Sequence, residues 1–92
     1  MEFTDVIKTL TDADRKIVRA FIMLRNGKRE VEGREFLKYM KIADITARRD
    51  GPLKPILIIF GSGTVKFPTG GEARFEAFRK EFEANEQTRR AE

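Results

Sequence analysis

The chain contains no cysteine and no histidine. Without them the protein has no disulfide, no thiolate nucleophile and few of the usual zinc ligands, and it lacks the side chain that most often transfers protons near neutral pH. No apolar run approaches the roughly 20 residues that a membrane-spanning helix needs, and the N-terminus lacks the basic-then-apolar order of a signal peptide. We therefore expect a cytoplasmic protein with no metal, no cofactor and no membrane partner.

The chain of 92 residues has the length of one domain, 1–92. A domain of this size buries only roughly 60–65% of the surface that its unfolded form exposes, which leaves no room for a large catalytic cleft. No two carboxylates are paired by the sequence for acid–base catalysis, and Ser62 has no base partner that can be identified. The glycine loop at 61–64 lacks the spacing of a phosphate-binding loop. We therefore expect neither enzymatic activity nor a nucleotide site.

The net charge of +4 is concentrated in the middle of the chain. Residues 25–54 hold nine Lys or Arg against five acids, whereas residues 1–24 balance at four against four and residues 71–92 carry five basic and six acidic groups. A basic sector between two neutral ones is the footprint of a phosphate-binding face. A solvated surface without a partner gives the same composition, so charge alone leaves both interpretations open.

The first part of the chain predicts a short helix or arm at 1–10 and a longer helix after it. At Thr11 the pattern T-x-x-D places a hydroxyl cap before an acid at the third helical position, which is a start signal for a helix. Asn26 and Gly27 supply the left-handed conformation that ends one. Apolar residues between these points are expected to build the core.

The basic sector predicts a helix-turn-helix. Val31 is expected to enter the core as a one-rung strand, and a second helix follows from about Gly33. A third helix is expected over 44–50, and Gly51-Pro52 closes it because proline disfavours helical geometry in the residue before it. The second helix is expected to bury three apolar side chains, Phe36, Leu37 and Met40.

The last part of the chain predicts a β-hairpin and a final helix. The apolar run 55–60 and the segment 65–67 flank the glycine loop, so residues 54–67 are expected to form a two-stranded hairpin. Residues 72–90 follow as a helix, whose polar end from 85 to 92 is expected to fray. One stripe of this helix, Phe75, Phe78 and Phe82, either covers the outer face of the hairpin or forms a dimer seam.

Two segments resemble known DNA-binding families. Ile42-Ala-Asp-Ile-Thr-Ala-Arg-Arg-Asp50 is similar to the recognition helix of DeoR-type winged-helix repressors, which tend to read I/V-S-x-x-T-I/V-R-R-D. The segment Arg49-Asp-Gly-Pro-Leu-Lys-Pro55, followed by a hairpin and Val65-Lys-Phe-Pro68, resembles MerR-like and excisionase-type small winged helices. These resemblances imply a winged helix-turn-helix domain, α+β in class. Its three-helix core and hairpin wing would span 11–69, and a C-terminal helix would follow.

The sequence departs from these families at three points. Lys41 stands where the turn usually has glycine, and Gly51-Pro52 replaces the leucine that normally carries the recognition helix onward. The tip of the hairpin has no arginine. Contacts to a minor groove would therefore come from backbone amides, small hydroxyl side chains or flanking lysines.

The function predicted from these features is sequence-specific binding of double-stranded DNA, by a small transcriptional regulator or a DNA-binding accessory of a phage or mobile element. The 44–50 helix is expected in the major groove and the 54–67 hairpin on the flanking backbone, with a homodimer as one option. A second hypothesis is a protein–protein adaptor that uses the apolar hairpin and the phenylalanine helix. The expected DNA-binding residues are Arg34, Lys38, Lys41, Thr46, Arg48, Arg49, Lys54, Ser62, Thr64 and Lys66.

Overall fold

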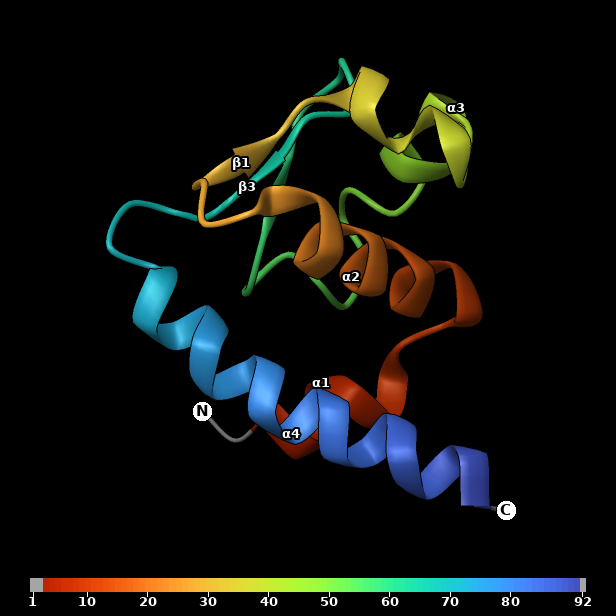
Figure 1. The fold of residues 1–92 in the computed structure, drawn as a ribbon, viewed down its shortest axis with the longest axis vertical. Helices are drawn as coiled ribbons and strands as arrows, with labels where there is room; N and C mark the ends of the chain where they lie inside the picture. Colours follow the sequence, from red (N-terminus) through yellow and green to blue (C-terminus); the bar gives the residue numbers. More distant parts are fainter. Residues whose placement is uncertain (1–2, 92) are drawn as a thin grey trace.

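The computed structural model describes residues 3–91, and within them five helices surround a small antiparallel sheet (Figure 1). The α+β class predicted from the sequence is confirmed. Figure 1 shows α1 and α4 together on one side of α2, with the sheet, η1 and α3 on the other side. In chain order the elements are α1 (Phe3–Thr9), α2 (Asp12–Arg25), β1 (Glu30–Val31), the 3₁₀ helix η1 (Gly33–Lys38), α3 (Ile42–Thr46), β2 (Ile58–Ile59), β3 (Val65–Lys66) and α4 (Glu72–Ala91).

The start and end of α2 follow the signals in the sequence. The Thr11 side chain accepts a hydrogen bond from the Asp14 backbone N–H at 3.1 Å, and the Asp14 carboxylate accepts one from the Thr11 N–H at 2.9 Å. This reciprocal pair satisfies two donors that the first helical turn leaves without partners. At the other end, Asn26 and Gly27 both have positive φ, 46° and 79°. The predicted boundaries of this helix are therefore confirmed.

The sheet has three strands rather than the two of the predicted hairpin. β3 lies in the centre and pairs antiparallel with both β1 and β2. Val31 is the buried residue of β1 and lies opposite Val65, as a one-rung strand should. The β2 strand is much shorter than the predicted 55–60 run. The chain instead makes hydrogen-bonded turns from 51 to 57, in a segment that contains two prolines, which lack a backbone N–H.

The predicted helix-turn-helix has different bounds and geometry in the structure. Its second helix is a 3₁₀ helix, and Leu37, expected in the core, is 59% exposed. The third helix, α3, runs from Ile42 to Thr46 instead of over 44–50. Lys41 is its extended N-cap residue, and the segment after Thr46 continues as single turns. Arg48 and Arg49 therefore lie in turns beyond the helix, not on it.

The core joins α4 to the rest of the chain through aromatic rings. Phe75 is fully buried and its ring lies 5.3 Å from that of Phe21 on α2 and 5.1 Å from that of Phe67 after β3. Phe78 and Phe82 are 0% and 1% exposed, so the predicted stripe is a packing face inside the monomer and not an exposed seam. The polar end that was expected to fray is helical up to Ala91, and Glu92 lies outside the described residues.

The hairpin tip lies directly against the start of η1. A Cβ atom added at Gly33 would come within 2.3 Å of the Ser62 carbonyl oxygen, which is backbone and cannot rotate away. Gly63 meets α3 in the same way, since a Cβ there would lie 3.1 Å from Ile42 Cγ2. The tip is thus held against the first residues of both η1 and α3, and it does not project freely.

Gly33→Ala is therefore expected to destabilise the protein, because the hairpin tip must move away from η1. The expected loss is about 1–3 kcal/mol in the free energy of unfolding, as for other overpacked sites. Chemical denaturation measures it. Gly61→Ala, in the hairpin loop that Gly33 contacts, is the matched control: nothing lies within 4 Å of its added Cβ, so we expect little change. Equal stability of the two variants would show that the tip is free to move.

No helix within residues 3–91 is long and apolar enough to cross a membrane.

Candidate nucleic-acid interface

The predicted DNA-binding residues lie on η1, at the start of α3, in the turns after it and on the hairpin. Because the hairpin tip contacts the first residues of η1 and α3, these segments form one continuous surface at the top of Figure 1. Arg34 is next to one of these contacts and Lys41 next to the other. The structure therefore brings together segments that are up to about thirty residues apart in sequence.

Arg48, one of the two adjacent arginines that were expected to contact DNA, points into the protein. Its Nε and Nη2 donate to the two carboxylate oxygens of Asp14 at 2.8 and 2.9 Å. Asp14 has no exposed surface, and the Arg48 side chain is 28% exposed. A bidentate arginine–carboxylate pair of this kind is among the strongest interactions that an arginine makes. The guanidinium of Arg48 therefore fastens the turn after α3 to the first turn of α2.

The electrostatics of this pair favour the ionised state. Burial alone raises the pKa of the Asp14 carboxyl, but the hydrogen bonds from Arg48 and Thr11 outweigh burial and bring the pKa below its ordinary value of 3.8. The bond to Asp14 in turn raises the pKa of Arg48. Both groups are charged at neutral pH, so they neutralise one another and Arg48 adds little to the outer field.

Three other basic side chains of this surface have no ion-pair partner among the described residues. Lys38, Lys41 and Arg49 are exposed, and none of them forms an ion pair within the described part of the chain. They lie on three successive segments: the end of η1, the cap of α3 and the turn after α3. An exposed cation without an internal partner is available to a phosphate group.

Arg49 and the hairpin line one hollow of about 320 Å³. Leu57 and Ile59 contribute apolar wall, and the exposed side chains of Ile58 and Phe60, 36% and 39% exposed, stand at its edge. Lys66 lies over the Phe60 ring, with Nζ 5.4 Å from the ring centroid. The hollow therefore combines the Arg49 guanidinium with the Phe60 side chain, and the paired Lys54 and Asp50 also line it.

The remaining predicted residues make local contacts. Thr46 donates its hydroxyl to the Ala43 carbonyl at 3.3 Å, and Ser62 donates to Thr64 at 3.1 Å on the hairpin tip. Arg34 pairs with Glu32 at 2.6 Å, and Lys54 pairs with Asp50 at 3.4 Å. Both ion pairs are solvent-exposed, and exposed pairs of this kind are weak enough for a phosphate to compete for the cation.

Two features of this surface were not visible in the sequence. Asp14 was assigned only to the helix cap, and nothing in its local pattern points to a partner 34 residues away. Ile58 and Phe60 were expected to be covered, because the run 55–60 has no polar residue to mark an outer face. Exposure of these two side chains depends on the twist and shortness of β2, which local composition does not encode.

No protein-family model, no curated protein and no solved structure matches this chain.

Proposed function

We propose that the protein binds double-stranded DNA through the surface formed by η1, α3, the turns after α3 and the hairpin. The observation that carries the proposal is the set of three exposed cations, Lys38, Lys41 and Arg49, which lie on successive segments and form no ion pair within the described residues. The contribution of such cations to DNA affinity is the release of counterions from the phosphate backbone. A winged helix-turn-helix is the arrangement we propose for it, since the chain order of helices and strands is compatible with that fold.

In this arrangement α3 and the turns after it face the major groove, and the hairpin lies on the flanking backbone. Arg49 is the arginine that reaches a base edge or a phosphate, because Arg48 is held by Asp14. Lys41 and Lys38 contact phosphates beside it. A five-residue helix offers few base contacts, so most of the affinity comes from the backbone. A small transcriptional regulator or a DNA-binding accessory of a phage or mobile element could bind in this way, with few base contacts and many backbone contacts.

The double variant Lys41→Ala/Arg49→Ala tests the proposal. If both side chains contact phosphates, the slope of log affinity against log salt should fall by about 2, and affinity at low salt should weaken at least roughly tenfold. Fluorescence anisotropy with a labelled random duplex at a series of salt concentrations measures both quantities.

The matched control is Lys8→Ala/Lys80→Ala, which also removes two exposed positive charges but from α1 and α4, away from the proposed face. It should leave the salt slope nearly unchanged. The same loss of slope in both double variants would mean that net charge, and not this face, attracts the duplex. A wild-type protein without affinity at low salt would exclude the DNA function altogether.

A protein–protein adaptor is the second candidate, and the exposure of Ile58 and Phe60 on the hairpin favours it. The phenylalanines of α4 cannot take part, because they are buried. Here the decisive measurement is a stable complex, by size-exclusion chromatography with light scattering, that Phe60→Ala disrupts. Duplex binding that depends on Lys41 and Arg49 would favour DNA instead.

A further inference from the structure

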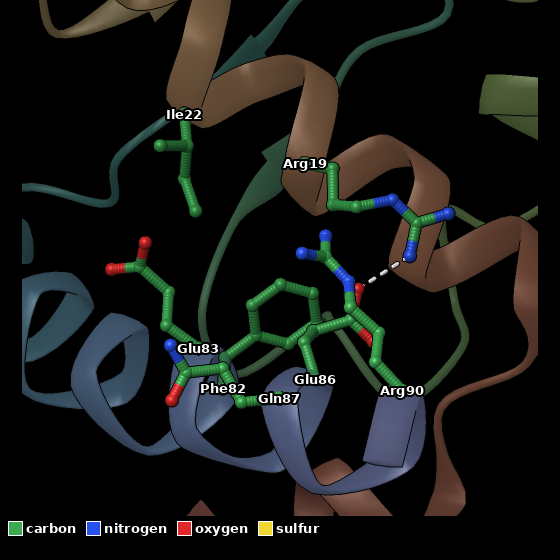
Figure 2. Close-up of a pocket in the computed structure, with 7 residues that line it drawn as sticks. All are labelled: Arg19, Ile22, Phe82, Glu83, Glu86, Gln87 and Arg90. Carbon is green, nitrogen blue, oxygen red and sulfur yellow. Dashed lines mark hydrogen bonds and ion pairs between the residues drawn. The ribbon is translucent and has the colours of Figure 1, made fainter. Parts of the chain in front are cut away.

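A second charged site lies between α2 and α4, on the other side of the molecule from α3 (Figures 1 and 2). Two adjoining hollows of about 230 and 370 Å³ share Arg19, Glu86 and Arg90 in their walls, so they form one cleft. Figure 2 shows Arg90 reaching back from the end of α4 into the gap between the two helices. Arg15 and Arg89 complete a group of four arginines around the cleft.

The acids in this cleft do not neutralise all four arginines. Glu86 is bonded to both Arg15 and Arg19, at 3.1 and 2.5 Å. Burial raises the pKa of Glu86, yet the bonds from these two arginines outweigh burial and lower the pKa, so the carboxylate is ionised at neutral pH. The single negative charge of Glu86 is thus shared between the guanidinium groups of Arg15 and Arg19.

The two arginines at the end of α4, Arg89 and Arg90, have weaker ion-pair partners than Arg15 and Arg19, or none within residues 3–91. Arg89 reaches Asp12 at 3.5 Å, but that carboxylate is 96% exposed, so water weakens the pair. Arg90 has no ion-pair partner within residues 3–91. The mouth of the cleft is therefore an open cationic site.

Arg15 supplies an independent observation at the same place. Its side chain is 6% exposed; its Nη groups donate to Asn85, Glu86 and the Ile7 carbonyl, while its buried Nε has no acceptor within the described residues. Buried donors without an acceptor are rare in folded proteins. The arginine group of this cleft thus has more donors than the chain provides acceptors.

The wall opposite the arginines is apolar in part, because the Glu83 carboxylate and the Gln87 amide line it together with Ile22 and Phe82. Ile22 on α2 is half-buried, and it points toward the Phe82 ring on α4 across the gap in Figure 2. The cleft therefore combines guanidinium donors at its mouth with a wall of mixed character, in which Ile22 is the partly exposed apolar side chain and Glu83 is paired with Arg79. Small-molecule sites commonly combine a few polar groups that orient a ligand with apolar side chains that contact it.

We propose that the α2–α4 cleft binds a small organic anion, with its phosphate or carboxylate group on Arg19 and Arg90 and its apolar part against Ile22, where the buried Phe82 ring forms the floor. The planar guanidinium fork matches both anionic groups. The site is separate from the proposed DNA surface, and it requires no DNA binding by the protein.

The test is a titration of the full chain with phenyl phosphate, followed by NMR chemical shifts of residues in α2 and α4. We expect saturable shifts confined to the cleft, and at least tenfold weaker affinity in Arg90→Gln. This variant breaks no hydrogen bond or ion pair within residues 3–91, because Arg90 forms none with them. Inorganic phosphate, which lacks the apolar part, should bind more weakly than phenyl phosphate.

The matched control is Lys80→Gln, which removes one exposed positive charge from the same helix outside the cleft. It should bind phenyl phosphate like the wild type. An absence of saturable shifts, or an equal loss of affinity in Lys80→Gln and Arg90→Gln, would overturn the proposal. Equal affinity for inorganic phosphate and phenyl phosphate would contradict the role given to Ile22 and Phe82.

Discussion

Arg48→Met is expected to lower the free energy of unfolding by about 3 kcal/mol at pH 7, because it leaves the Asp14 carboxylate buried without its charged partner. This is the low end of the range for breaking a buried ion pair. We expect the low end because Arg48 is itself partly exposed, and its removal lets some water reach the carboxylate. Denaturation by urea, followed by circular dichroism, measures the change.

The pH dependence of this loss identifies its cause. The pKa of Asp14 is lowered in the folded protein, so the pair stabilises the fold above the ordinary value of 3.8, and this stabilisation disappears as pH falls through the folded pKa. Arg48→Met removes the contribution. The difference between wild type and variant should therefore be complete at pH 7 and shrink below pH 3.8.

Lys54→Met is the matched control for Arg48→Met, since it removes another basic side chain from the same stretch. Lys54 and its partner Asp50 are 71% and 81% exposed, so we expect a change below about 0.5 kcal/mol. Similar losses in the two variants would mean that Arg48 is not an internal anchor. Arg48 would then become available to DNA, as the sequence suggested.

This pair also shows where inference from the sequence stops. The capping signal at Thr11 and the left-handed Asn26-Gly27 end are local, and both boundaries of α2 were predicted from them. The partner of Asp14 is set by tertiary packing of the turn after α3 against α2. Two adjacent arginines, Arg48 and Arg49, look alike in the sequence, but one points inward and the other outward.

The sheet illustrates the same limit. Val31 was predicted as a one-rung strand from its place between two helices, and it pairs with Val65. The run 55–60 is rich in strand-forming residues, yet only Ile58 and Ile59 form a strand. Pro52 and Pro55 favour turns before them, and a strand propensity does not reveal how many residues find a partner. The number of strands follows from long-range pairing.

The candidate DNA surface was predicted in outline and not in detail. The concentration of basic residues in 25–54 gave its location along the chain, and Lys38, Lys41 and Arg49 remain uncommitted there. Periodicity could not reveal that η1 is a 3₁₀ helix, which leaves Leu37 exposed. The α2–α4 cleft was missed because residues 85–92 were expected to fray, although Glu86 and Arg89 contact α2.

Phe75→Ala is expected to have the largest effect on stability of any change considered, a loss of about 3–5 kcal/mol. Its ring is fully buried and lies within 6 Å of three others, those of Phe21, Phe67 and Phe78. These rings join α4 to α2 and to the segment after β3, so a cavity here affects every layer of the fold. A domain of 92 residues has roughly 5–14 kcal/mol of stability in total, so much of it would be lost.

The melting temperature of Phe75→Ala should therefore fall by about 12 °C or more, since each kcal/mol corresponds to about 4–8 °C in a domain of this size. Phe60→Ala makes the same substitution at a ring that is 39% exposed, and its effect should be within about 1 kcal/mol. The loss in Phe75→Ala should also be independent of protein concentration. If the phenylalanines of α4 formed a dimer seam, the melting temperature of the wild type would rise with concentration, because association stabilises the folded state by mass action. A constant melting temperature, together with a large difference between the two alanine variants, follows only from rings that are packed inside a single chain.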